Sequence, residues 1–252
     1  MNQESEQLLR VREAKLLEWI LLGPDASQCT TSVLDIIQDL ARRLLIMQTS
    51  RGEICHILSP ARQRKLSIAE CSDLNVHLNT FYLQLVKGLE NLVCALQLQV
   101  SAREQTDQTD VNGCVNGDLV DRILRLNLRD SMPTVAVSFE SRFGWLTELH
   151  ARDPCRLSNP LYVLPAAAEE GELEILRGLE TELAIAAQAG DFREYRQKIG
   201  EAHKLGTYFP LLASRGADRI HLWPLPQQVI EDAEAFLSVA EPVFFVFQHR
   251  TA

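Results

Sequence analysis

The stretch of residues 73–100 places the tightest limit on how this chain can fold. Its apolar residues recur at steps of three and four, a spacing that matches one face of an α-helix and not the alternation of a strand. This stripe consists of Leu74, Leu78, Phe81, Leu85, Leu89, Leu92 and Leu96. We expect a helix with Ser72 as its N-cap, about 28 residues and roughly 40 Å long, which must contact several neighbours. Gly88, near its middle, predicts a close approach by another helix.

Apolar periodicity predicts helices in most of the remaining chain. The expected segments are residues 8–20, 33–47, 119–128, 135–150, 172–189, 191–204 and 227–247. A short basic helix is expected after Ser59-Pro60, and Asp191 is expected to cap the segment that follows it. Pro242 should bend or split the last helix, and residues 243–247 form a short strand in a minority alternative. Residues 152–165 carry three prolines and are expected to be irregular.

The fold class that follows is all-α, a bundle of about seven helices around the long central helix, with no convincing sheet. Residues 102–117 are rich in Gln, Thr, Asp, Asn and Gly and lack apolar periodicity, which is typical of a flexible polar loop. A domain boundary there is an alternative. We favour one helical domain over residues 1–252, with this loop as an insertion.

Composition limits the classes of function. The net charge of −9 argues against non-specific binding to nucleic acid, which depends on Lys and Arg at the phosphates. None of the six cysteines has the spacing of a zinc site, so no metal and no cofactor are expected. The first residues do not have the pattern of a signal peptide, and no apolar run is long enough to span a membrane. We therefore expect a cytoplasmic protein.

Acidic residues dominate one segment. Residues 166–191 contain seven acids and a single base, Arg177. The paired acids at 169–170 and at 172 and 174 show no sign of converging as a general acid and base. The favoured interpretation is the solvated face of a helix.

Two stretches resemble the bacterial HEPN-like proteins (higher eukaryote and prokaryote nucleotide-binding). Residues 78–82 (Leu-Asn-Thr-Phe-Tyr) and 88–92 (Gly-Leu-Glu-Asn-Leu) are similar to the inner helix of that helical bundle. Residues 152–162 (Arg-Asp-Pro-Cys-Arg-Leu-Ser-Asn-Pro-Leu-Tyr) resemble the segment R-D-P-A-A-H-R-I-P-L-Y of the same group. The resemblance extends over residues 74–247 and implies a helical bundle.

The chain departs from this family at the residue that its chemistry needs. HEPN ribonucleases use an R-x4–6-H pair, usually across a dimer, with histidine as general acid and base and arginine on the phosphate. Arg152 matches the arginine, but Leu157 occupies the place of the histidine and Ser158 that of the next basic residue. Leucine cannot transfer a proton. The resemblance therefore implies the scaffold, and a homodimer, but not the catalysis.

Other arginine–histidine pairs have the same spacing, in a number too close to chance to decide the question. The pairs are Arg51 with His56, Arg196 with His203, and Arg215 with His221. Of these, Arg196 with His203 lies within an expected helix. Arg152 and His203 are therefore the catalytic candidates, although surface positions are favoured for the displaced pairs.

Five residues are candidates for structural or binding roles. Glu90 and Asn91 border the inner stripe of the central helix, where partial burial would demand hydrogen-bond partners. Arg152 is expected to form a salt bridge with Glu90. Asp153 and Tyr162 belong to the segment that resembles the HEPN-like group, and a structural turn is favoured over a ligand contact there.

Three functions are compatible with these features. The first is a non-catalytic HEPN-like protein that binds RNA or a protein partner, which the resemblance places in bacterial defence or stress systems. The second is a metal-independent HEPN ribonuclease that uses a displaced arginine and histidine. The third is a protein-interaction module with no role in nucleic-acid binding, which the acidic charge favours.

Overall fold

The architecture was established from a computed structural model. It describes residues 3–22, 31–59, 66–104, 119–126, 128–157, 160–167, 170–202, 205, 207–215 and 220–248. Ten α-helices and one small sheet lie within these ranges. The expected basic helix after Ser59-Pro60 falls on residues 60–65, outside the described residues.

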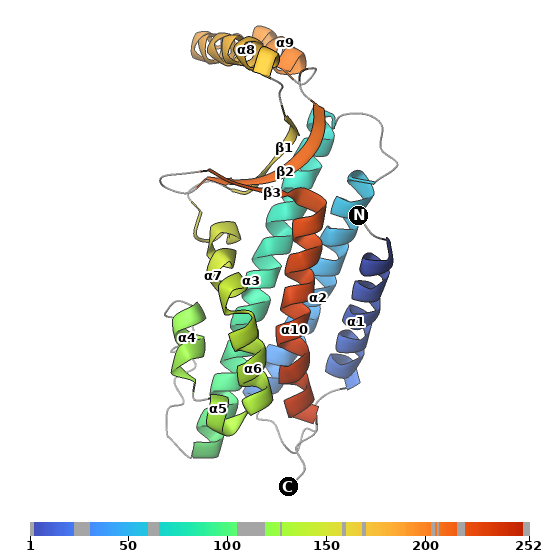
Figure 1. Cartoon of the computed structure of the whole chain (residues 1–252), viewed down its shortest axis with the longest axis vertical. Helices are drawn as coiled ribbons and strands as arrows, with labels where there is room; N and C mark the ends of the chain where they lie inside the picture. The colour runs from blue at the N-terminus through green and yellow to red at the C-terminus, as the bar shows by residue number, and fades with distance from the viewer. Residues whose placement is uncertain are drawn as a thin grey trace.

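Four long helices run side by side and form the body of the molecule (Figure 1). They are α1 (Gln3–Leu22), α2 (Thr31–Ile57), α3 (Ile68–Glu104) and α10 (Leu225–Gln248). Helix α3 is the longest, and it packs along α2 on one side and against α10 on another. The prediction of an all-α bundle around a long central helix is therefore confirmed. No described helix is apolar enough over a sufficient length to cross a membrane.

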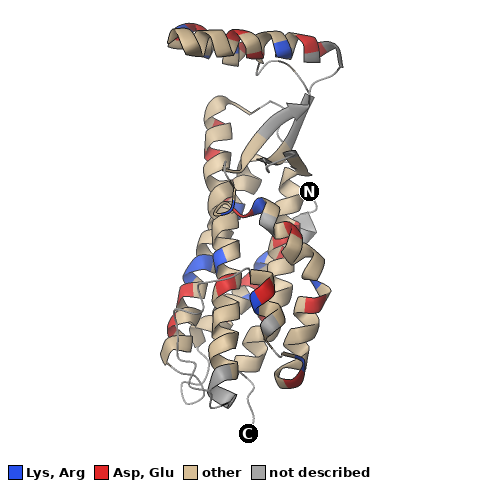
Figure 2. Ribbon diagram, turned by 90° about the vertical axis from the view of Figure 1, so that its left-hand side faces the viewer, with Lys and Arg blue, Asp and Glu red and all other residues tan. Residues whose placement is uncertain are grey.

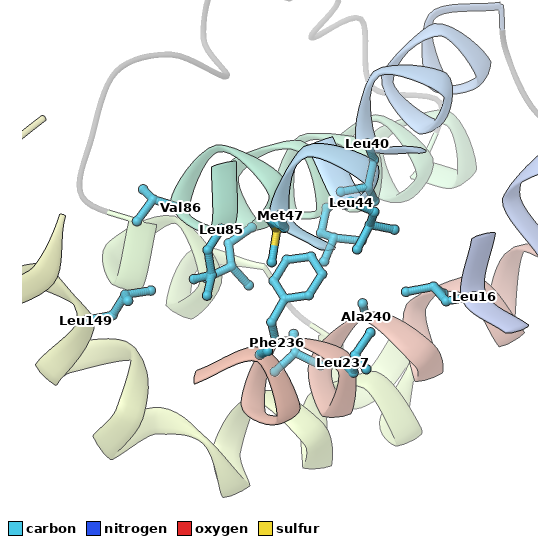
Figure 3. Packing of buried hydrophobic residues seen from close by; sticks show 14 of the residues in the cluster. Leu16, Leu40, Leu44, Met47, Leu85, Val86, Leu149, Phe236, Leu237 and Ala240 are labelled. Carbon is cyan, nitrogen blue, oxygen red and sulfur yellow. The ribbon is translucent and has the colours of Figure 1, made fainter. Parts of the chain in front are cut away.

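The core forms where the apolar stripe of α3 meets its neighbours. All seven leucine and phenylalanine residues of the predicted stripe are at most 1% exposed. Phe236 of α10 points between α3 and α2, beside Leu85 and Met47 (Figure 3). A Cβ atom on Gly88 would lie only 3.1 Å from the Phe236 ring and 3.3 Å from Leu40. The close helix approach that Gly88 predicts is confirmed.

Helix α3 starts earlier than expected. Ser67 and Glu70 form a capping box, in which the Ser67 hydroxyl accepts from the Glu70 backbone N–H at 3.3 Å and the Glu70 carboxylate accepts from the Ser67 N–H at 2.8 Å. The prediction of Ser72 as N-cap is wrong, because Ser72 lies one turn inside the helix. The C-terminal end reaches Glu104, so the expected loop at 102–117 begins as helix, and residues 105–118 lie outside the described residues.

Short helices cover one side of the bundle. The helix expected at 119–128 ends early, as α4 (Leu119–Arg125), and the helix expected at 135–150 is divided into α6 (Pro133–Ser141) and α7 (Phe143–Leu149). The short helix α5 (Leu128–Ser131) lies between α4 and α6. Pro133 occupies the start of α6, where its missing N–H costs no helical hydrogen bond. A 3-10 turn, η2 (His150–Arg152), follows α7 and brings Arg152 back toward the bundle.

A three-stranded antiparallel sheet lies at one end of the bundle, and the expectation of no sheet is wrong here. The strands β1 (Tyr162–Ala167), β2 (Thr207–Arg215) and β3 (Ile220–Pro224) pair in the order β1-β2-β3. Each strand contains a proline, which concealed it in the sequence. The β1–β2 register shifts between Leu164 and Ala166, where Pro165 has no N–H to donate.

A helical hairpin is inserted between β1 and β2 and lies beyond the sheet, away from the bundle (Figure 1). It consists of α8 (Glu170–Ala189) and α9 (Phe192–Ala202), which pack mainly against each other. Gly190 makes the turn with a φ of 69°, which glycine adopts without strain. The Asp191 carboxylate then accepts the backbone N–H groups of Arg193 and Glu194 at 3.1 and 3.0 Å, which confirms Asp191 as a cap.

The last helix is continuous through its proline. Pro242 lies inside α10, which extends to Gln248, so the predicted split and the alternative strand at 243–247 are both wrong. Val243, Phe244 and Phe247 are buried, and this packing holds the helix together past the missing hydrogen bond.

Candidate functional site

The most unusual feature of the bundle is a buried ion pair near its sheet end. Arg152, at the end of η2, is fully buried, and so is its partner Asp232 on α10. Their closest approach is 2.9 Å, from the Arg152 Nε to the Asp232 Oδ2. Isolated buried charges are very costly, so both groups need dedicated partners.

Asp232 is satisfied on both oxygens. Its Oδ1 accepts from Trp145 Nε1 at 2.8 Å, from Arg152 Nη2 at 2.9 Å and from Gln228 Nε2 at 3.0 Å. Its Oδ2 accepts from the Tyr82 hydroxyl at 2.7 Å. The donors come from α3, α7, η2 and α10, so this one carboxylate ties four elements together.

Arg152 is less completely satisfied than its partner. Its Nε lies close to Asp232 but its N–H is poorly aligned, and neither Nε nor Nη1 has a hydrogen-bond partner among the described residues. The guanidinium carbon lies 5.0 Å from the centre of the Trp223 ring, a cation–π contact from β3. An aromatic face thus takes the place of a further hydrogen-bond acceptor.

Tyr82 remains a hydrogen-bond donor in this cluster. Burial, and then the negative charge of Asp232, raise the pKa of the Tyr82 hydroxyl well above its ordinary value. The hydroxyl therefore stays protonated and its proton stays on the bond to Asp232. The cluster of Arg152, Asp232, Tyr82, Trp145 and Gln228 is suited to fixing structure, because solvent does not reach the arginine or the carboxylate.

The two stretches that carry the resemblance in the sequence meet in space. Tyr82 comes from the first stretch and Arg152 from the second. In addition, Asn79 of α3 accepts the Leu161 N–H at 2.9 Å and donates to the Leu161 carbonyl at 2.7 Å. Asn75, one turn earlier, accepts the Val163 N–H at 2.8 Å. The central helix thus anchors the first strand of the sheet through two asparagines.

The predicted salt bridge between Arg152 and Glu90 is wrong. Glu90 instead contacts Lys87, whose Nζ lies 2.7 Å away. It lies eight residues beyond Tyr82, or about 12 Å along the helix axis at 1.5 Å per residue, and Arg152 reaches only the level of Tyr82. Asn91 donates to Asp39 of α2 at 2.8 Å, which is a contact between two helices of the bundle.

The other candidates of the second stretch have structural contacts. Asp153 is buried and accepts the Cys155 N–H at 2.9 Å, while Arg156 lies 3.3 Å from its carboxylate. Tyr162 is half-buried and opens β1 opposite Ala213. Leu157 packs against the core. Ser158 lies outside the described residues.

The displaced arginine–histidine pairs do not form a site among the described residues. Arg51 is buried and its Nη2 lies 2.6 Å from Glu13 of α1. Its sequence partner His56 is exposed. Arg196 is exposed on α9, and His203 lies outside the described residues.

His221 is linked to the Arg152 cluster through Trp223. Its imidazole stacks on Trp223 with ring centres 5.6 Å apart, and Trp223 also faces the Arg152 guanidinium. The indole thus contacts both the arginine and a histidine. Sequence spacing paired this histidine with Arg215, whose side chain is not described.

Sequence reasoning missed Asp232, Trp145, Gln228 and Trp223. A signal for Asp232 was present, because it lies on α10 between Val229 and Phe236, within the apolar stripe of that helix. An acid on a buried helix face must have a partner. The partner's identity depends on how α7 and η2 fold back, which no local pattern reveals.

The hairpin presents a second candidate site, on its surface. Helix α8 has two seams with heptad-like spacing. The first includes Leu179, Leu183 and Ala186 and faces α9. The second, the outward seam, includes the exposed residues Ile175, Gly178, Ile185 and Ala189, and it is interrupted at Glu182, which contacts Lys198 of α9. Ile175 is 54% exposed and Ile185 is 61% exposed, although both are large apolar side chains.

Two further positions of the hairpin are open to solvent. Phe192, the first residue of α9, is 71% exposed just after the Gly190 turn. A Cβ atom on Gly178 would meet no atom within 4 Å, so the seam is open at that point. A helix normally turns its apolar side toward a partner, and an exposed apolar seam on a solvated helix is typical of a contact surface.

Other features of the described residues do not form a reactive site. No group of three His, Cys, Asp or Glu side chains there could hold a metal ion. A pocket of about 390 Å³ between α4, α5 and α6 has mainly apolar walls, with Arg129 and Glu140 at its edge. None of the residues that line it belongs to the Arg152 cluster.

Comparison with known proteins gives no relative to guide this assignment: no protein-family model, no curated protein and no solved structure matches the chain.

Proposed function

We propose that this protein acts by binding another protein, without catalysis, and that the α8–α9 hairpin makes the contact. The observation that carries the proposal is the outward seam of α8, where Ile175 and Ile185 are more than half exposed while the equivalent seam toward α9 is covered. The bundle is then a scaffold that holds the hairpin at one end.

Burial of Arg152 supports the absence of catalysis. In a ribonuclease of this kind the arginine must reach a phosphate oxygen, but this guanidinium is 0% exposed and faces Asp232 and Trp223. Freeing it would leave the Asp232 carboxylate buried without its cation, which is strongly unfavourable. As part of the same proposal, the chain resembles HEPN-like proteins in its scaffold and not in its chemistry.

A ribonuclease is the second candidate, because the Trp223 ring contacts both Arg152 and His221. The test is incubation of the full chain with structured and single-stranded RNAs, in parallel with His221→Ala and His203→Ala. We expect no cleavage by any of the three proteins. Cleavage by the wild type that disappears in either variant would replace the proposed function with the enzyme.

The binding role is tested by site-specific photo-cross-linking in cells that express the full chain. A benzophenone amino acid at Ile185, on the outward seam, is compared with one at Ala187, which is exposed on another side of the same helix. We expect discrete cross-linked species from position 185 that resist ribonuclease and are weak from position 187. Products that ribonuclease removes, or equal products from both positions, would contradict the proposal.

A further inference from the structure

The outward seam of α8 carries information about what it binds. Helix α8 has five acids and one base, and the whole hairpin, from Glu170 to Ala202, has eight acids and four bases, a net charge of −4. Figure 2 shows acidic residues along the hairpin, well separated from the bundle. The apolar seam is therefore embedded in a negative field.

Part of this charge is unused within the hairpin. Lys198 of α9 is the single lysine of the hairpin, and it lies 2.7 Å from Glu182 and 3.4 Å from Glu201, so it is already engaged by acids. Glu174 and Glu180 are exposed on α8 and form no ion pair with a described residue. Glu174 directly precedes Ile175 and flanks the seam, where it is placed to meet a cation on a partner.

From this surface we propose that the outward seam docks a basic amphipathic α-helix of another protein. This rests on the proposed function and names the chemistry of the partner. The apolar face of such a helix would cover Ile175 and Ile185, its backbone would approach at Gly178, and its lysine or arginine residues would meet Glu174 and the surrounding field. An apolar centre with charges at its rim is the common arrangement of helix-in-groove recognition.

A second copy of this chain is a poorer occupant. Two hairpins of net charge −4 would repel each other across the shared seam, whereas a basic helix gains from the same field. Nucleic acid is excluded by the sign of that charge. The proposal therefore commits to a protein helix that carries positive charge beside its apolar stripe.

The test uses fluorescence anisotropy with the full chain and a labelled synthetic helix of about 18 residues, leucine on one face and lysine on the other. A second peptide replaces every lysine with glutamate. We expect the lysine peptide to bind at least about tenfold more tightly than the glutamate peptide, and this ratio to shrink at high salt because the attraction is screened.

Variants locate the binding. The double variant Ile175→Ser with Ile185→Ser should bind the lysine peptide about tenfold or more weakly, because central apolar anchors are removed. Ala187→Ser, on another face of α8, should change the affinity for the lysine peptide by less than about twofold. Glu174→Lys is an independent variant that keeps the apolar seam and should also weaken binding. Circular dichroism confirms that each variant is folded.

Several outcomes would overturn the inference. Equal binding by the double isoleucine variant, or by both peptides, would show that the seam or the charge is irrelevant. If the free chain sediments as a dimer and the Ile185→Ser variant sediments as a monomer, the seam binds a second copy of the chain. If the lysine peptide does not bind but position 185 gives ribonuclease-resistant cross-links, the inference of a basic partner is wrong, while the proposed binding to a protein stands.

Discussion

The bundle and the hairpin share the same sequence pattern, an apolar stripe with helical spacing, but the stripe has a different role in each. In α3 the apolar stripe is buried along its whole length, from Leu74 to Leu96. In α8 one seam is covered by α9, while a second seam with Ile175 and Ile185 faces solvent. Helical periodicity therefore predicts only that a helix forms. Whether an apolar seam belongs to the core or to a contact surface depends on what covers it.

Charge differs between the two regions in the same way. The bundle buries Arg152 against Asp232 and surrounds the carboxylate with three further donors, so the charge serves the fold. The hairpin keeps most of its acids exposed, and no described residue of α9 is buried. We therefore expect substitutions of these buried groups of the bundle to be costly for folding and substitutions on the outward seam not to be.

The largest effect is expected for Arg152→Ala. The substitution leaves the Asp232 carboxylate buried beside Tyr82 and Trp145 without its cation, and we expect a loss of about 3–5 kcal/mol in the free energy of unfolding. Chemical denaturation measures it. Arg129→Ala is the matched control, because Arg129 pairs with Glu140 on the surface and its loss should leave the midpoint of denaturation unchanged. Equal effects of the two variants would refute the structural role of the cluster.

A smaller effect is expected for Gly88→Ala. The added methyl group would lie 3.1–3.3 Å from the Phe236 ring and Leu40, which are themselves tightly packed, and we expect a net loss of about 1–2 kcal/mol despite alanine's better helix propensity. Gly52→Ala, in α2, meets no atom within 4 Å and should instead gain about 0.5–1 kcal/mol. Stabilisation by both substitutions would mean that α10 does not approach α3 closely.

The pH dependence of stability should report on the second buried ion pair of the bundle. Burial raises the pKa of Glu13 above its ordinary value of 4.5, although Arg51 opposes this. The folded state then holds the Glu13 proton more tightly than the unfolded state, so this contribution to stability is fully present below about pH 4.5 and is lost as the pH rises through the raised pKa.

Glu13→Gln removes this titration and isolates its effect. The stability of the wild type relative to the variant should fall as the pH is raised from about 4 through the raised pKa, and then level off. Denaturation curves of both proteins over this range measure the difference. A relative stability that increases with pH would show that Arg51, rather than burial, dominates at Glu13.

The smallest effect on folding is expected on the outward seam. Ile175→Ser with Ile185→Ser exchanges solvent-exposed side chains and should change the free energy of unfolding by less than about 0.5 kcal/mol. Leu85→Ala, from the buried stripe of α3, should cost about 2–5 kcal/mol in the same experiment. A cost above about 1 kcal/mol for the double isoleucine variant would mean that the seam supports the fold.

Sequence reasoning succeeded where local pattern determines structure. The stripe from Leu74 to Leu96 specified the central helix, Gly88 specified a close contact, and Asp191 specified a helix start. It failed where the outcome depends on distant parts of the chain. The strands were hidden because their prolines at 165, 210 and 224 are typical of loops. The residues that hold the first strand against α3, Asn75 and Asn79, lie more than 80 residues away from it in the sequence.

The candidate sites were predicted to a similar extent. Arg152 was expected to be paired with a carboxylate, which is right, but the partner was expected on the wrong helix. Asp232 is 80 residues away in sequence, and only the return of η2 to the bundle brings the two together. The acidic character of α8 was recognised in the sequence. Its exposed seam was not, because Ile175 and Ile185 differ from core residues only in what covers them.

The central claim is that a cooperatively folded bundle carries a hairpin whose outward seam is not part of the core. Hydrogen–deuterium exchange of the wild-type chain, followed by mass spectrometry, tests this directly. A short helical hairpin with one covered seam is marginally stable, so we expect amides of α8 and α9 to exchange far faster than those of α3 and α10, which should open only on global unfolding. Protection of the hairpin equal to that of α3 would contradict the account, because the seam would then belong to the folded core.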